Sequence, residues 1–348
     1  MKHMNLNIKL LIAFVVLLAG SMLSQSIFRK QHTVSYSDQM HRSVALTVDL
    51  FKTIDKLKLE RDIKSDMTSN VPYSYMIGDE WSEITTTLGS LEAKEISTNP
   101  DFSALVVRLL HEAGIKKGDN VGVVLSGSFP ALAVSTLAAL QTMDVEALIM
   151  SSVGASTYGA NQPGATWLDM ESALKRDGIH FNTVLVTMGA GEDAGIGLSD
   201  EGVAMIRNAA YRNKVDLYVP ESLKESINKR VAMFRDANIS LLINIGGNET
   251  ALGSCAHALS IPNGLVTEMH VCHDEDRGLI ARMNELGIPF INMLDLKDLA
   301  TRYGMTISPG LSYPESRSLY NTTVTNRIAI AFILVFSLVP VVFLRKNT

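Results

Sequence analysis

The sequence predicts an α/β protein with a Rossmann-like, mostly parallel, doubly wound sheet, flanked by N- and C-terminal transmembrane helices. From Pro100 onward, short apolar runs alternate with longer amphipathic segments, which is typical of a parallel sheet with helices on both faces. Each end of the chain carries an uncharged apolar stretch between basic residues. We therefore expect a membrane helix in 1–29, a stalk helix and polar loop in 30–100, an α/β domain in 101–320 and a second membrane helix in 327–345.

The N-terminal apolar segment holds 19 uncharged residues between Lys9 and Arg29. At ~1.5 Å per residue, a helix of this length nearly matches a hydrocarbon core of ~30 Å. The segment also resembles a secretory signal peptide, because basic residues precede it and small residues follow it. Cleavage of residues 1–26 is therefore an alternative. Both interpretations send the following domain across the membrane.

The C-terminal apolar segment holds 17 uncharged residues between Arg327 and Arg345. Pro340 is tolerable in a membrane helix because neighbouring groups can satisfy the freed backbone carbonyl. A buried core helix is the alternative. With two spans, residues 30–326 lie on one side of the membrane and both tails on the other. Basic residues flank both segments on both sides, so the positive-inside rule favours only weakly an extracytoplasmic domain held in the cell membrane.

Residues 30–100 divide into a helical part and a polar part. An amphipathic helix of roughly six turns is predicted by apolar residues at spacings of three and four, and we expect it to pack as a stalk against the domain. These residues are Met40, Val44, Leu46, Val48, Phe51, Ile54 and Leu57. Residues 62–100 lose this periodicity and become rich in Ser, Thr, Asn and Gly, which predicts a long loop of the kind that usually has a function.

Within the α/β domain, five apolar runs predict buried strands and the segments between them predict helices. The strands are expected at 121–125, 147–150, 183–186, 241–245 and 289–293. The helices are expected at 101–113, 130–142, 199–213, 221–237, 274–286 and 295–303.

Charge and motifs exclude one class of partner and leave the cofactor unknown. The net charge is −5 and no stripe of Lys and Arg occurs, which argues against nucleic acid because phosphate neutralisation needs clustered cations. The first strand-to-helix turn has neither a GxGxxG fingerprint nor a Walker lysine, so the sequence gives no nucleotide signature.

The residues directly after each strand are the candidates for binding, since ligands of open α/β sheets bind outside the carboxyl ends of the strands. After the first strand, a small turn with hydroxyl donors leads into a helix that begins with Pro130, which predicts an anion site or, alternatively, a tight turn with a serine cap. The loop 151–161 is so rich in glycine and serine that we expect it to approach a ligand closely. The predicted ligand-binding residues are Ser126, Gly127, Ser128, Ser151, Ser152, Gly154, Ser156, Asn161, Gly189, Gly246, Gly247 and Asn248.

Catalysis at this edge would need a nucleophile or an acid and base, and the sequence leaves the choice open. A serine nucleophile would need a histidine base, yet no histidine directly follows these strands. Carboxylates could act as acid and base, or they could cap helices and bind backbone amides. The catalytic candidates are Ser126, Ser128, Glu192, Asp193 and Glu249.

A second cluster combines thiol, imidazole and carboxylate groups between residues 255 and 274. Its members are Cys255, His257, His270, Cys272, His273 and Asp274. Their spacing is not a standard zinc pattern, so we predict no metal site. Cys255 and Cys272 either form a disulfide, which an extracytoplasmic location permits, or remain two buried thiols.

Several strings of the sequence together resemble the bacterial poly-gamma-glutamate system protein family over residues 36–320. They are ITTTLGSLEAK (84–94), TNPDFSALVVRLL (98–110), SGSFPALA (126–133), SSVGASTYGAN (151–161), TWLDME (166–171), INIGGNETALG (243–253) and PNGL (262–265). The resemblance implies a role in making, exporting or retaining this anionic capsule or surface polymer. It implies as partners the poly-gamma-glutamate ligase, its membrane partners and the polymer itself. It supplies a pathway but no reaction.

Three functions are compatible with these observations. The first is a membrane-anchored accessory component whose cavity handles the polymer or a glutamyl intermediate. The second is a hydrolase or transferase acting on γ-glutamyl amide bonds, and the third is a scaffold for the synthase complex. Because an acidic domain repels polyglutamate, binding would rely on local donors such as the Ser126–Ser128 turn, the 151–161 loop or Lys94.

Overall fold

The computed structural model describes residues 6–27, 29–64, 70–270, 277–308, 310, 312–325, 331 and 335. The chain forms two compact units. The first joins the N-terminal part up to Ser35 to the C-terminal part from Tyr320, and the second extends from Tyr36 to Leu319.

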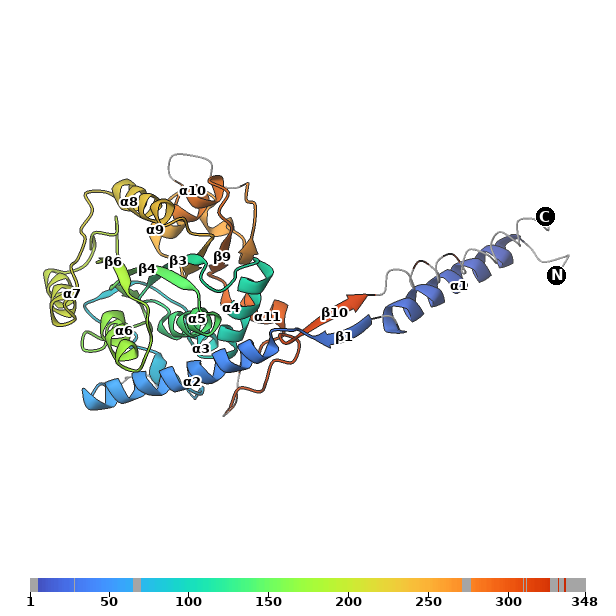
Figure 1. The fold of residues 1–348 in the computed structure, drawn as a ribbon, viewed down its shortest axis with the longest axis horizontal. Helices are drawn as coiled ribbons and strands as arrows, with labels where there is room; N and C mark the ends of the chain where they lie inside the picture. The colour runs from blue at the N-terminus through green and yellow to red at the C-terminus, as the bar shows by residue number, and fades with distance from the viewer. Residues whose placement is uncertain are drawn as a thin grey trace. The chain divides into compact units, whose positions relative to one another are not determined.

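The first unit contains a helix and a two-stranded ribbon. The helix α1 (Leu6–Ile27) leads to β1 (Arg29–Thr33), which pairs antiparallel with β10 (Asn321–Thr325) (Figure 1). Among the residues that the structure describes, no helix is both long enough and apolar enough to cross a membrane. Apart from residues 331 and 335, the predicted C-terminal membrane helix at 327–345 lies outside the described residues.

The second unit is built on a six-stranded sheet of order β6-β4-β3-β7-β9-β8. The parallel strands are β3 (Asn120–Ser126), β4 (Glu146–Ser152), β6 (Thr183–Thr187), β7 (Leu241–Ile245) and β9 (Phe290–Met293). The short strand β8 (Gly264–Val266) adds to β9 antiparallel at one edge. The predicted mostly parallel α/β sheet is confirmed. The chain runs outward from β3 through β4 to β6 and then returns to β7, so the strand order reverses between β3 and β7.

Helices cover both faces of this sheet (Figure 1). On one face, α8 (Leu223–Asp236) and α10 (Leu279–Glu285) bury apolar side chains against β3, β7 and β9. A Cβ on Gly122 of β3 would lie 2.8 Å from the Phe234 ring, so a glycine is needed where α8 approaches the sheet. The other face carries α4 (Asp101–Glu112) and α5 (Pro130–Met143). Nearly all of α5 is buried because a further helix packs over it.

That further helix is α2 (Ser37–Glu60), the predicted amphipathic helix. It packs against α4, α5 and α6 (Trp167–Arg176) and belongs to the same compact unit as the sheet. Two of its buried positions are small and polar, because Ser43 and Thr47 are fully buried whereas Val44, Leu46 and Val48 are only half-buried. The Thr47 hydroxyl donates to the Ser43 carbonyl at 2.9 Å, which satisfies it without solvent.

Residues 62–100 are not one continuous loop, contrary to the sequence prediction. They contain the 3₁₀ turn η1 (Ser74–Met76), the strand β2 (Thr85–Thr87) and the helix α3 (Leu91–Ser97). The strand β2 pairs in parallel with the two-residue strand β5 (Ala155–Ser156), which lies in the loop after β4. The Ser90 hydroxyl caps α3 by accepting from the Ala93 amide at 3.3 Å. Such short elements leave no periodicity in the sequence.

The remaining helices complete the domain. The predictions at 199–213, 221–237 and 295–303 correspond to α7 (Asp200–Arg212), α8 and α11 (Leu296–Tyr303). The helix predicted at 274–286 is shorter and is α10, while residues 271–276 lie outside the described residues. Three α-helices of the described residues were not predicted, namely α6, α9 (Glu249–Leu252) and the α3 of the preceding paragraph. The first had a signal in the sequence, since Thr166 and Asp169 form a capping box at its start.

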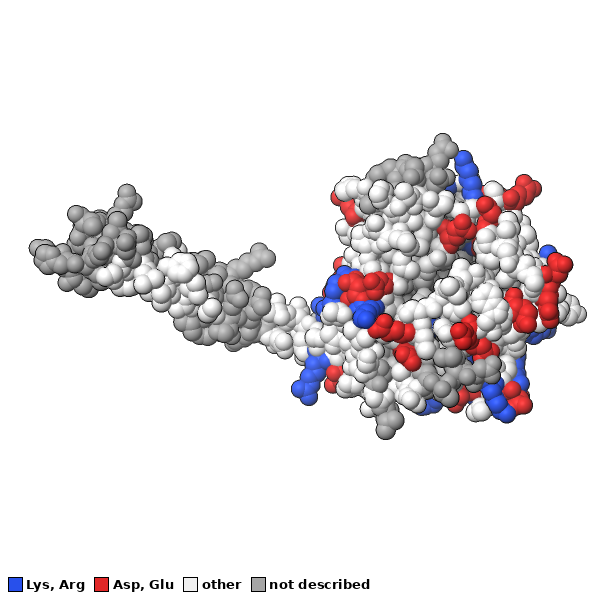
Figure 2. All heavy atoms as spheres, turned by 180° about the vertical axis from the view of Figure 1, so that it is seen from behind, with Lys and Arg blue, Asp and Glu red and all other residues white. Residues whose placement is uncertain are grey.

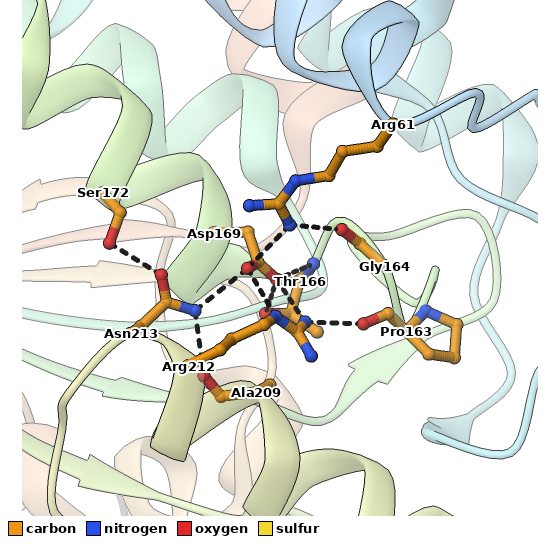
Figure 3. Close-up of polar contacts among 9 residues, drawn as sticks. All are labelled: Arg61, Pro163, Gly164, Thr166, Asp169, Ser172, Ala209, Arg212 and Asn213. Atoms are coloured by element: carbon orange, nitrogen blue, oxygen red, sulfur yellow. Dashed lines mark hydrogen bonds and ion pairs between the residues drawn. The ribbon is translucent and has the colours of Figure 1, made fainter.

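A buried carboxylate ties the end of α2 to α6 and α7 (Figure 3). Asp169 is fully buried and accepts from Arg61 at 2.9 Å and from the Arg212 Nε at 2.7 Å. It also accepts from Asn213 at 2.9 Å and from the Thr166 hydroxyl at 2.7 Å. Burial by itself raises the pKa of the Asp169 carboxyl, but these donors outweigh burial and lower the pKa to about 2.

We predict that Asp169→Asn lowers the free energy of unfolding of the full-length chain at pH 7 by about 2 kcal/mol. This value is smaller than that for breaking a fully buried ion pair, because the side chains of Arg61 and Arg212 are about one-third exposed. The pKa of Asp169 is lower in the folded than in the unfolded state. Its stabilisation is therefore complete above pH ~4 and is lost as pH falls towards 2. Urea unfolding followed by circular dichroism at several pH values measures this difference.

The matched control is Asp236→Asn, because Asp236 is a surface acid whose side chain is 72% exposed. We expect its effect to stay within about 0.5 kcal/mol. Equal effects of the two substitutions at pH 7 would contradict the role given to Asp169.

Candidate functional site

A cavity of about 420 Å³ lies at the carboxyl ends of the parallel strands. We call it the strand-end cavity. Its walls come from the ends of β3, β4, β6 and β7, together with β2 and α3. It therefore includes the point where the strand order reverses, which is where open α/β sheets bind ligands. The predicted residues that line it are Ser126, Ser128, Ser152, Gly154, Ser156, Gly189, Asp193, Gly247, Asn248 and Glu249.

Five predicted site residues do not line this cavity, namely Gly127, Ser151, Asn161, Gly246 and Glu192. Asn161 shows why. Its amide nitrogen donates to the Asp79 carbonyl at 2.8 Å and to the Thr85 hydroxyl at 3.0 Å, and its oxygen accepts from the Asp79 amide at 3.0 Å. The Asn161 side chain is thus used to hold the segment that leads into β2.

The loop 151–161, which we expected to approach a ligand closely, contributes Ser152, Gly154 and Ser156 to the cavity wall, and its glycines also allow close contact between backbones. A Cβ on Gly159 would lie 2.8 Å from the Gly127 carbonyl oxygen. A Cβ on Gly154 would lie 2.8 Å from the Met188 carbonyl oxygen. These glycines let the loops after β3, β4 and β6 pack directly on one another.

Asp193 is a buried residue of the cavity wall and is paired within the protein. Its carboxylate accepts from the hydroxyls of Thr187 at 2.7 Å and Ser226 at 2.6 Å. It also forms an ion pair with Arg230 at 2.9 Å, and the side chains of both partners are more than nine-tenths buried. Both carboxylate oxygens are therefore occupied, so this geometry does not favour an acid or base role for Asp193.

The other two acidic candidates are exposed and bind backbone amides. Glu192 accepts from the amide of Leu223, at the first turn of α8, at 2.5 Å. Glu249 accepts from the Glu192 amide at 3.1 Å. This arrangement corresponds to the capping alternative stated for these acids.

Lys94, one of the local donors expected from the sequence, is the most deeply buried charged residue that lines the cavity. It projects from α3 and only 2% of it is exposed. Its Nζ donates to the Ser156 hydroxyl at 2.8 Å and to the Ser128 carbonyl, and it lies 3.6 Å from the centre of the Phe129 ring. No carboxylate within the described part of the chain forms an ion pair with it. Burial lowers the pKa of the Lys94 amine to about 7.

Further donors in the cavity have no partner among the described residues. The Ser152 hydroxyl makes no hydrogen bond there, although only 5% of the residue is exposed. The Asn248 side-chain oxygen accepts from the Ala251 amide at 2.8 Å, whereas its NH₂ group has no acceptor in the same part of the chain. The Ser126 hydroxyl accepts from the Ser128 amide at 3.3 Å and keeps its proton to donate. The cavity thus offers a cation and free donors, which suits a carboxylate.

The described residues of the cysteine and histidine cluster do not form a group that could bind a metal ion. In the described ranges, no group of three or more His, Cys, Asp or Glu residues could hold a metal ion. Cys255 is buried, and no free cysteine occurs in these ranges. Cys255 is disulfide-bonded, which supports the disulfide alternative over that of two buried thiols. Cys272, His273 and Asp274 lie outside the described residues.

On the face of the globular unit seen in Figure 2, acidic and basic side chains are interspersed and no continuous basic stripe is visible. Comparisons of the chain with family models, with curated proteins and with solved structures give no match. The function must therefore be argued from the site and from the resemblance of the sequence.

We predict that Lys94 titrates several pH units below an ordinary lysine. Acetic anhydride labelling of the full-length chain at different pH values, followed by peptide mass spectrometry, measures the neutral fraction of each amine. The Lys94 midpoint is expected at about pH 7 and that of Lys58, a second buried lysine, at about pH 8. The exposed Lys52 should titrate above 10.5, because Asp49 raises the pKa of Lys52. A Lys94 midpoint near that of Lys52 would contradict the burial argument.

Proposed function

We propose that this protein is a membrane-anchored accessory component of a poly-gamma-glutamate system and that its strand-end cavity binds the polymer or a glutamyl intermediate. The observation that carries the proposal is Lys94, a buried amine with no carboxylate partner in the described part of the chain. A buried ammonium without a counterion is unfavourable. A carboxylate of the ligand would supply the missing negative charge.

The charge of the chain restricts how such a polymer can bind. The net charge of −5 repels a polyanion at long range, so attraction has to come from short contacts inside the cavity. The free donors of Ser126, Ser152 and Asn248 lie in the same cavity as Lys94. A volume of about 420 Å³ suits a short segment or a chain end rather than a long stretch of polymer.

We also propose that the apolar segments at the two ends hold the protein in the cell membrane, with the α/β domain outside the cytoplasm. Their uncharged lengths of 19 and 17 residues support this. The register of the ribbon supports it too, because Arg29, which follows the first segment, faces Thr325, which shortly precedes the second. The segments would then enter the bilayer together and could contact the ligase and its membrane partners there.

We predict that Lys94→Met weakens binding of a short γ-linked glutamate oligomer to the detergent-solubilised full-length protein by about tenfold or more, since a charge-assisted contact is lost. Isothermal titration calorimetry measures the affinity.

For the wild type, the affinity for the oligomer should fall as pH rises above about 7, because the anion binds the charged Lys94 amine. Proton uptake should accompany binding.

Lys58→Met is the matched control, because Lys58 is also buried but does not line the strand-end cavity. It should bind the oligomer as the wild type does. Equal affinities of the wild type and Lys94→Met would refute the binding site.

A deletion strain that keeps normal surface polymer would refute the role in the poly-gamma-glutamate pathway. If a Lys94→Met copy restores polymer output in that strain, the scaffold function is favoured.

A further inference from the structure

Ser156 and Lys94 form a close pair within the strand-end cavity. The Lys94 Nζ lies 2.8 Å from the Ser156 Oγ, and the two residues are 2% and 6% exposed. The Ser156 position is fixed by its neighbours, since its amide donates to the Ser128 hydroxyl at 3.0 Å. The next amide, of Thr157, donates to the Thr87 carbonyl at 2.9 Å. Strand β5 therefore presents this hydroxyl to the amine in one defined place.

The serines of the cavity differ in what their hydroxyls contact. In the described part of the chain, only the Ser156 hydroxyl is hydrogen-bonded to the Lys94 amine. The Ser126 hydroxyl accepts from the Ser128 amide, and the Ser128 hydroxyl accepts from the Ser156 amide. The absence of a histidine after the strands argued against a serine nucleophile. A neutral lysine within hydrogen-bond distance of the serine can act as the base instead.

The charged groups around the Lys94 amine leave it free of a fixed counterion. Asp193 and Glu249 are the charged side chains from other elements that line the cavity, and they are bound to Arg230 and to the Glu192 amide respectively. On α3 itself, Glu92 forms an ion pair with Lys297 of α11 at 2.7 Å. Glu95 follows Lys94 directly in α3, but burial is the cause that lowers the pKa of Lys94. The helix α5, which also packs on α3, carries no charged residue.

We propose that Ser156 and Lys94 are a nucleophile and general base that catalyse acyl transfer from a γ-glutamyl amide. The glutamyl identity of the substrate rests on the function proposed above. The proximity of the two groups, their burial and their place in the cavity support the pair independently of that identity.

In the first step, the Ser156 Oγ attacks the amide carbonyl carbon while its proton passes to the Lys94 Nζ. The carbon–nitrogen bond then breaks, and the Lys94 ammonium returns the proton to the leaving nitrogen. An ester on Ser156 remains. Water attacks this ester while Lys94 takes its proton, the bond to the Ser156 Oγ breaks, and the Lys94 ammonium returns the proton to that oxygen as the acid is released. If an amine of another chain attacks instead, the amide bond is re-formed and the acyl group is transferred.

Binding and chemistry require opposite charge states of the Lys94 amine. The charged amine attracts a carboxylate, whereas only the neutral amine can accept the Ser156 proton. Ligand affinity should therefore decrease above pH 7, while the acylation rate should increase through about pH 7. These opposite pH dependences would not follow from a purely structural role of Lys94.

The test uses the full-length protein in detergent and p-nitrophenyl acetate, a small acyl donor that needs no glutamyl recognition. We expect release of p-nitrophenolate in a burst and a single acetyl ester on Ser156, found by peptide mass spectrometry. Ser156→Ala should lose this adduct completely. Lys94→Arg keeps the positive charge but cannot deprotonate, so it should slow acylation about 100-fold or more while retaining oligomer binding.

Two variants serve as controls, Lys58→Met for removal of a buried lysine and Ser135→Ala for removal of a buried hydroxyl. Ser135 lies in α5 outside the cavity, and its hydroxyl has no partner in the described residues. Both should acylate at the wild-type rate. A Ser156 hydroxyl that gains no adduct, or a rate that does not change with pH between 6 and 8, would overturn the proposed pair.

The two proposals can fail separately. If the oligomer binds but Ser156 is not acylated, the nucleophile–base pair is wrong and the binding function stands. If Ser156 is acylated in a Lys94-dependent way but the oligomer does not bind, the pair stands and its glutamyl substrate is wrong. Mass spectrometry of oligomer lengths distinguishes the reactions, since hydrolysis shortens the chains and transfer redistributes their lengths.

Discussion

The arrangement of the cavity depends on the pairing of β2 with β5. These strands are three and two residues long, yet their parallel pairing joins the segment before α3 to the loop after β4. Together with the packing of α3 on α11 and α5, this pairing places α3 across the carboxyl ends of the strands. The approach is close enough that a Cβ on Gly89 would lie 2.9 Å from the Ser156 hydroxyl. A side chain there would displace the group that contacts Lys94.

The electrostatics of the site follow from which charges are already neutralised. Asp193 is the most deeply buried acid of the cavity, but Arg230 and two hydroxyls occupy its oxygens. Lys94 has only neutral partners, which are a hydroxyl, a carbonyl and the Phe129 ring. Neutral partners orient an amine without stabilising its charge as a carboxylate would, so burial dominates its protonation. Because Asp193 is neutralised and Lys94 is not, the cavity can attract an anion although the chain as a whole is acidic.

The sheet could be predicted from the sequence because its signals are local. Each parallel strand is a short apolar run, and the residues that follow these runs include seven polar or charged residues and three glycines that line the cavity. The pairing of β2 and β5 was missed because it joins segments about 70 residues apart, with too few residues for a periodic pattern. The burial of Lys94 has the same cause, since it depends on α3 lying over loops distant in sequence. The prediction of which face of α2 is buried was only partly correct. Close packing against neighbouring helices buries the small side chains of Ser43 and Thr47 in place of larger apolar neighbours.

The ribbon of β1 and β10 joins parts of the chain that are far apart in sequence, since Thr33 and Asn321 are separated by 288 positions. Bringing two such segments together in an unfolded chain carries a large entropic cost, but a folded domain whose ends meet removes most of it. The amide of Val34 donates to the Tyr320 carbonyl at 3.0 Å, so the two segments of the first unit stay paired up to the residues that adjoin the second unit in sequence. The ribbon is therefore expected to form last. During synthesis its second strand emerges only after the whole domain, and the ribbon's closure would mark a domain that is already folded.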